Sequence, residues 1–251
     1  MPSVMPGLGL EPWQIAYLAV CILGAAWVRG YSGFGFSALV ITSAALVTDP
    51  VPLVATLVMC EIALSVGQAR GLRGRADWRR IWGMLAGAAV VMPFSFTLIA
   101  QLGEDLARFA ISAMVLVMCL AMARGWQFGR EIGTPGNLAA GMTSGVANGA
   151  AVGGLPIAVF LAGQPVAAPV FRATMIAYLT LVCLLALPSL WMTGLLSGTS
   201  FVILAAMLPL MALGLWLGGR RFTASSPHDF KRFTLWLLGT LSVLGLLRSL
   251  W

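Results

Sequence analysis

The sequence has little charge. Aspartate, glutamate, lysine and arginine make up 9% of its 251 residues, whereas 60% of the residues are hydrophobic and the mean hydropathy is +0.95. A soluble domain of this size cannot bury so much apolar surface. The composition therefore excludes a soluble protein and predicts an integral membrane protein in contact with the lipid bilayer.

The sequence also lacks the residue types on which many enzymes depend. Its one histidine, His228, cannot by itself assemble a histidine metal site or a catalytic triad. The four cysteines lie inside hydrophobic segments without metal-ligand spacing, and we interpret them as packing residues: Cys21, Cys60, Cys119 and Cys183. We expect no enzymatic activity, no metal and no cofactor.

Basic residues are absent from the beginning of the chain. No lysine or arginine precedes Arg29, which argues against a signal peptide and predicts that the first apolar segment is retained. The net charge of +7 would suit a nucleic-acid-binding protein, but most basic residues stand in short clusters between apolar runs. Because the orientation of membrane helices explains such clusters, we expect no nucleic-acid partner.

Long apolar runs predict an all-α polytopic membrane protein. A run of about 20 apolar residues is long enough to cross a bilayer as a helix, and the alternating pattern of a β-barrel strand does not occur. The predicted segments are 13–29, 36–47, 51–68, 80–101 and 106–123 in the first half, and 137–148, 154–163, 167–187, 198–218 and 233–250 in the second.

The two halves repeat one plan. Gly33-Phe34-Gly35-Phe36 interrupts one apolar stretch, and Gly153-Gly154-Leu155-Pro156 interrupts another. Two further pairs recur at nearly the same spacing: 54–56 with 172–174, and 105–109 with 229–233. We predict a first repeat at 1–124, a cytoplasmic linker at 125–136 and a second repeat at 137–251. Paired broken segments are typical of transporters with a central binding site.

The path of each broken segment decides the topology. If each segment crosses the membrane once, each half has four spans and the halves are parallel. If each segment dips in and returns, each half has an odd number of spans and the repeats are inverted. Inversion places eleven basic residues on the cytoplasmic side and two outside, whereas the parallel arrangement places eight inside and five outside. The positive-inside rule therefore favours inverted repeats.

Three ionisable residues, Arg29, Glu61 and Arg172, lie within apolar runs. A charge at the bilayer centre costs about 2.5–3.5 kcal/mol on insertion scales, so such residues usually face the interior of a helix bundle. Either arginine could instead reach an interface along its flexible stem. Glu61 lies too deep for that and is either the buried partner of an arginine or a protonatable group.

The two breaks predict an anion site. Glycine lets the backbone unwind, and Pro156 suits the first turn of a restarted helix. A helix restarted within the membrane presents N–H groups and a partial positive charge, and two such ends could hold an anion together with an arginine. Ser32, Asn148 and Thr174 could add hydrogen bonds. The glycines could otherwise serve only close helix packing.

Two glycine-rich signatures carry a family resemblance. Trp27-Val28-Arg29-Gly30-Tyr31-Ser32-Gly33-Phe34-Gly35-Phe36 resembles the first signature of the TauE/SafE family of sulfite exporters. The second is Gly145-Val146-Ala147-Asn148-Gly149-Ala150-Ala151-Val152-Gly153-Gly154-Leu155-Pro156, followed by Arg172-Ala173-Thr174. The resemblance implies a transporter of sulfite, organosulfonates or sulfoacetate in the bacterial inner membrane. Phe34 interrupts a run where the family often has glycines, which favours an organic sulfonate.

The resulting hypothesis is a secondary transporter that exports a small sulfur-containing anion by alternating access. The expected substrate-binding residues are Arg29, Ser32, Gly33, Gly35, Asn148, Gly153, Gly154, Arg172 and Thr174. The membrane potential would contribute about 2.3 kcal/mol per charge per 100 mV to anion export, and Glu61 could add proton coupling. The alternatives are an anion channel and a membrane scaffold that transports nothing.

Overall fold

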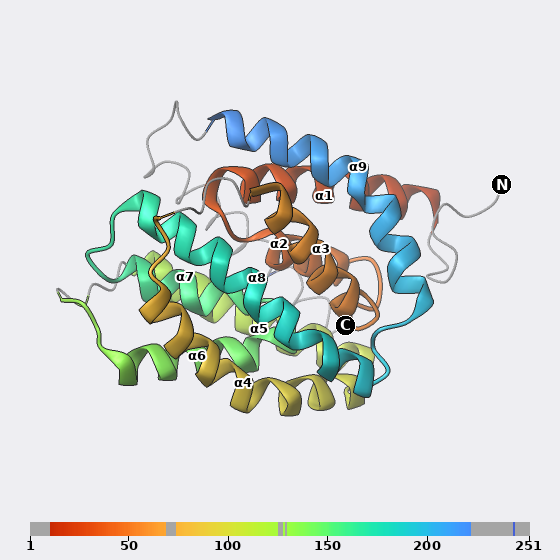
Figure 1. Ribbon diagram of the computed structural model, residues 1–251. Helices are drawn as coiled ribbons and strands as arrows, with labels where there is room; N and C mark the ends of the chain where they lie inside the picture. Colours follow the sequence, from red (N-terminus) through yellow and green to blue (C-terminus); the bar gives the residue numbers. More distant parts are fainter. Residues whose placement is uncertain (1–10, 69–73, 125–127, 129, 222–242, 244–251) are drawn as a thin grey trace.

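The chain folds into helices. The computed structural model describes residues 11–68, 74–124, 128, 130–221 and 243, and within these ranges it contains no strand (Figure 1). The helices are α1 (Pro12–Ser32), α2 (Phe36–Ala44), α3 (Leu53–Gln68), α4 (Trp78–Gln101), α5 (Glu104–Ala123), α6 (Thr134–Asn148), α7 (Gly154–Ala162), α8 (Ala168–Met192) and α9 (Gly198–Arg221). The all-α prediction is confirmed for these ranges, and the predicted segment 233–250 lies outside them except for residue 243.

Both predicted helix breaks are present. Helix α1 ends at Ser32, and the chain passes through Gly33 at φ 83° and Gly35 at φ 93° before α2 begins. This left-handed region is accessible to glycine without the steric penalty that other residues meet. Helix α6 ends at Asn148 and α7 begins at Gly154, with Ala151 at φ 56° between them. The second break therefore reaches a left-handed conformation without using glycine for it.

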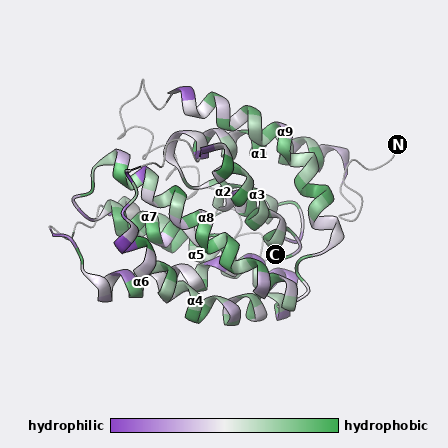
Figure 2. Cartoon of the chain, in the orientation of Figure 1, coloured by the Kyte–Doolittle hydropathy of each residue, from purple (hydrophilic) through white to green (hydrophobic). Residues whose placement is uncertain are grey.

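Four of the described helices are long and apolar enough to cross a membrane: Pro12–Ser32, Trp78–Gln101, Ala168–Met192 and Gly198–Arg220. Large apolar side chains point away from the bundle, among them Phe94 of α4, which is 75% exposed. Figure 2 shows green, hydrophobic residues along much of such helices and purple ones mainly near helix ends. Lipid can cover this apolar surface, so the arrangement is that of a multi-pass membrane protein.

Glycines bring two pairs of helices into backbone contact. A Cβ atom at Gly218 of α9 would lie 2.1 Å from the carbonyl oxygen of Trp27 in α1. A Cβ atom at Gly141 of α6 would lie 1.9 Å from the carbonyl oxygen of Met84 in α4. Small residues permit such close approach within a membrane, where van der Waals packing is a main source of helix association.

The contacts between helices are reciprocal between the two halves. If α1, α3 and α4 correspond to α6, α8 and α9, the contact of α1 with α9 corresponds to that of α6 with α4. In the same way, the contact of α3 with α9 corresponds to that of α8 with α4, while α3 and α8 contact each other. In this correspondence the two predicted repeats are interleaved, because α1 packs against α9 and α6 packs against α4.

Helices α3 and α8 run in opposite directions. Cys60 of α3 lies against Met207 of α9, and Gly67 lies against Leu215, so α3 and α9 are parallel. Helix α8 runs opposite to α9, to which a short connection joins it (Figure 1). Helices α3 and α8 are therefore antiparallel.

Candidate functional site

A small cavity lies where the two helix breaks meet. The N-terminal turns of α2 and α7 contribute Gly35, Ser37, Gly153 and Gly154 to its lining, and Asn148 at the end of α6 lies beside them. Helices α3 and α8 close the sides with Val58, Glu61, Leu179 and Cys183. Each half of the chain thus directs one restarted helix at the same space.

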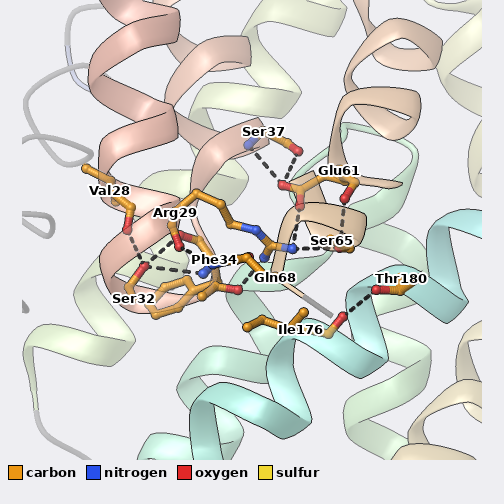
Figure 3. Close-up of polar contacts among 11 residues, drawn as sticks. Val28, Arg29, Ser32, Phe34, Ser37, Glu61, Ser65, Gln68, Ile176 and Thr180 are labelled. Atoms are coloured by element: carbon orange, nitrogen blue, oxygen red, sulfur yellow. Dashed lines mark hydrogen bonds and ion pairs between the residues drawn. The ribbon is translucent and has the colours of Figure 1, made fainter. Parts of the chain in front are cut away.

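A carboxylate occupies the N-terminal end of α2. Glu61, which is 5% exposed, accepts hydrogen bonds at Oε1 from the backbone N–H of Ser37 at 3.2 Å and from its Oγ at 2.6 Å (Figure 3). The partial positive charge of a helix N-terminus stabilises an anion in this position. Ser37 was not predicted from the sequence, although its place in the first turn after Gly35 was the available signal.

Arg29 is completely buried beside this carboxylate. Its Nη2 lies 3.2 Å from Glu61 Oε2 and donates to Ser65 Oγ at 3.0 Å, while Nη1 donates to the carbonyl oxygen of Gly33 (Figure 3). Arg29 is therefore buried in the helix bundle and does not reach a membrane interface. Glu61 is its ion-pair partner. Removing one member of a buried pair is expensive because it leaves the other charge uncompensated.

Arg172 reaches the first break from the second half of the chain. Its Nη2 donates to the carbonyl oxygen of Gly30 at 2.6 Å. A Cβ atom at Gly33 would lie 2.9 Å from Arg172 Cγ, so the glycine makes room for the arginine stem. Arg29 and Arg172 therefore both contact Gly33, and neither lines the cavity itself.

The second break is held by neutral hydrogen bonds. Tyr178 of α8 donates to Ser144 Oγ at 2.7 Å, and Ser144 Oγ donates to the carbonyl oxygen of Gly153 at 2.6 Å. Asn148 is 5% exposed, and its Nδ2 has a weak contact with Met92 Sδ at 3.7 Å. Ser144 and Tyr178 were not predicted, because nothing in their spacing relates them to the glycines.

The other residues expected to bind substrate serve nearby backbone. Ser32 Oγ donates to the carbonyl oxygens of Val28 and Phe34, and the backbone N–H of Asp77 donates to Thr174 Oγ1 at 3.0 Å. Neither Ser32 nor Thr174 lines the cavity. Phe34 packs edge-on against Phe171, so the apolar lining comes from Val58, Leu155 and Leu179 instead.

The expected residues therefore fall into three groups, one of which is Ser32 and Thr174 with their hydrogen bonds to backbone. Five of them line the cavity: Gly35, Glu61, Asn148, Gly153 and Gly154. Arg29, Gly33 and Arg172 form a cluster on the other side of the first break. Among the described residues, no group of three or more histidine, cysteine or acidic side chains could hold a metal ion.

A comparison with protein-family models gives one match that spans most of the chain. The model described as "Sulfite exporter TauE/SafE" matches residues 18–245, which include both helix breaks and every residue of the cavity. No curated protein and no solved structure matches the chain.

Proposed function

Because the chain belongs to the sulfite exporter TauE/SafE family and is a membrane transporter, we propose that it exports a small sulfur-containing anion across the bacterial inner membrane. The proposed substrates are sulfite, organosulfonates and sulfoacetate. One observation carries the proposal: the N-terminal ends of α2 and α7, one from each half, line a single buried cavity.

The chemistry of the cavity suits a sulfonate. Backbone N–H groups at a helix N-terminus bind anionic oxygens well, and inside a membrane they need a partner from protein, water or substrate. The Asn148 side chain adds an amide donor beside Gly153 and Gly154. Arg172, which meets Arg29 at Gly33, contributes positive charge from the other side of the first break, whereas the charge of Arg29 is paired with Glu61.

The apolar part of the cavity favours an organic sulfonate. Val58, Leu155 and Leu179 give it hydrocarbon walls next to the helix ends. Sulfite carries no apolar group to place against such walls, whereas the carbon chain of an organosulfonate gains free energy when it leaves water. Within the proposed class, the chemistry of the lining therefore favours the organosulfonates.

Alternating access follows from an inverted repeat, which we propose for this chain. The opposite directions of α3 and α8 and the reciprocal contacts between the halves support it. In such transporters one half rocks against the other around a site at their interface. If no proton crosses with it, a monovalent anion would be driven outward by an inside-negative potential of 100 mV with about 2.3 kcal/mol.

The proposal is tested by thermal unfolding of the detergent-purified protein with sulfite, methanesulfonate or sulfoacetate, with acetate and malonate as carboxylate comparisons. A bound anion stabilises the folded state, by about 2.7 kcal/mol at a concentration of 100 times Kd. We expect a sulfonate to raise Tm, the effect to disappear in Asn148→Ala, and Thr143→Ala, on the exposed side of the same helix, to retain it. Equal stabilisation by carboxylates, or none by any anion, would reject the proposal.

A further inference from the structure

The two helix ends at the cavity differ in one respect. The repeat pairs 54–56 with 172–174, and at that spacing the counterpart of Glu61 is Leu179. Both residues line the cavity. The N-terminus of α2 therefore contacts the carboxylate of Glu61. At the N-terminus of α7, the corresponding residue is the apolar Leu179.

The Glu61 carboxylate is incompletely satisfied. Oε1 accepts both hydrogen bonds from Ser37, whereas Oε2 is buried and accepts none. Oε2 lies 3.2 Å from Arg29 Nη2 and forms an ion pair with it, but it accepts no hydrogen bond from it. A buried, charged carboxylate oxygen without a hydrogen-bond donor raises the free energy of the folded state. A proton on that oxygen would remove its negative charge and with it this unfavourable contribution.

From this arrangement we propose that Glu61 is a tethered anion. Its carboxylate binds the N–H and O–H donors at the N-terminus of α2 and pairs with Arg29. When a proton neutralises the carboxylate, a substrate anion replaces it at these donors and at Arg29. The inference rests on the proposed function, because it concerns the same cavity. One proton is taken up by the Glu61 carboxylate for each anion bound, and no covalent bond forms or breaks. Anion binding and proton binding are thereby linked.

The surroundings of Glu61 support this exchange. From α1 it faces Arg29, from α2 the neutral Ser37, from α3 its neighbour Cys60 and, across the cavity, Cys183 of α8. Arg172 of α8 contacts Gly30 and Gly33. Arg29 is thus the cation in direct contact with Glu61 among the described residues, and protonation of Glu61 leaves its positive charge for the incoming anion.

The test measures methanesulfonate affinity between about pH 5 and pH 8, where the charge of this probe does not change. In the wild-type protein we expect the affinity to fall as pH rises, by up to about tenfold per pH unit for one linked proton. Glu61→Gln removes the competing charge, so it should bind more tightly than the wild type at the high end of the range and lose the pH dependence. Glu131→Gln, which neutralises an exposed carboxylate, should behave like the wild type.

The outcomes separate this inference from the proposed function. Wild-type affinity that is independent of pH, or Glu61→Gln affinity equal to or below that of the wild type, would overturn the tethered anion and leave the substrate class intact. If methanesulfonate and the other sulfur anions fail to bind either protein at any pH, the proposed function fails and this inference fails with it. A wild-type affinity that does not change with pH overturns the tethered anion even if Glu61→Gln does not fold.

Discussion

At Gly153, the absence of a side chain leaves the space in which Asn148 lies. A Cβ atom there would be 2.6 Å from Asn148 Cγ and 2.7 Å from its Oδ1, well inside van der Waals contact. The backbone of Gly153 has φ −57°, an ordinary helical value that alanine also adopts. A methyl group at this position would therefore act on the asparagine side chain rather than on the backbone.

Gly153→Ala is expected to displace the Asn148 amide and to weaken sulfonate binding at least tenfold, equivalent to a loss of about 1.4 kcal/mol. The protein should still fold, because only the end of a side chain has to move. The measurement is methanesulfonate affinity from the concentration dependence of Tm. Gly24→Ala is the control, since a Cβ atom there meets nothing within 4 Å, and it should bind like the wild type. An unchanged affinity in Gly153→Ala would contradict the role of Asn148.

At the scale of residues, the sequence predicted which polar side chains are buried. It was less informative about the groups that these side chains contact. Arg29 and Glu61 stood out because a charge within an apolar run needs a partner, and the structure places them 3.2 Å apart. Ser32 and Thr174 were expected at the anion, yet they bond to backbone groups. Hydroxyl side chains often bond to nearby backbone, and their direction is set by tertiary contacts that sequence spacing does not encode.

Among the helices, the closest packing joins α1 to α9 and α4 to α6. Gly30 and Gly218 both lie at the first contact, and a Cβ atom on either would come within 2.6 Å of a backbone oxygen of the facing helix. Backbone atoms cannot move aside as the end of a side chain can. The contact therefore depends on these two positions remaining glycine.

Gly218→Ala is expected to destabilise the protein by about 1–3 kcal/mol, because the added methyl group pushes α9 away from Trp27. Its neighbour Gly219 is a matched control, since a Cβ atom there meets nothing within 4 Å and alanine favours the helix. Gly219→Ala should leave Tm unchanged or slightly raised. Thermal unfolding in detergent compares the two variants, and equal Tm values would show that the contact contributes little.

The helices themselves were largely predictable. Apolar runs located them to within a few residues at most ends, and the glycine signatures located both breaks. The partners of each helix were not predictable, because every helix is apolar on several sides and the hydrophobic pattern does not distinguish lipid from protein. The positive φ of Ala151 was also not predictable. Glycines stand on both sides of this residue, and the sequence would have placed a positive φ at one of them.

For the whole molecule, the account depends on two halves with opposite orientations. The loop around Ala76 follows α3, and the loop around Ser197 follows its counterpart α8. In an inverted repeat these two loops lie on opposite sides of the membrane, and the arginine-rich first loop faces the cytoplasm. In a parallel repeat they would lie on the same side.

Ala76→Cys and Ser197→Cys test this arrangement in a protein whose four native cysteines have been replaced by serine. A maleimide that does not cross membranes is expected to label Ser197→Cys in intact cells. It should label Ala76→Cys only after the membrane is opened. Labelling of both positions from the same side would exclude the inverted repeat and the alternating-access mechanism built on it.

The central claim is that a sulfonate passes through the cavity between α2 and α7, and counterflow in proteoliposomes tests it most directly. Vesicles loaded with unlabelled methanesulfonate are diluted into a trace of the radiolabelled compound. The account predicts a transient, saturable accumulation of label that Asn148→Ala abolishes and Thr143→Ala retains. Absence of accumulation in active vesicles, or a flux that neither saturates nor exchanges, would contradict a carrier.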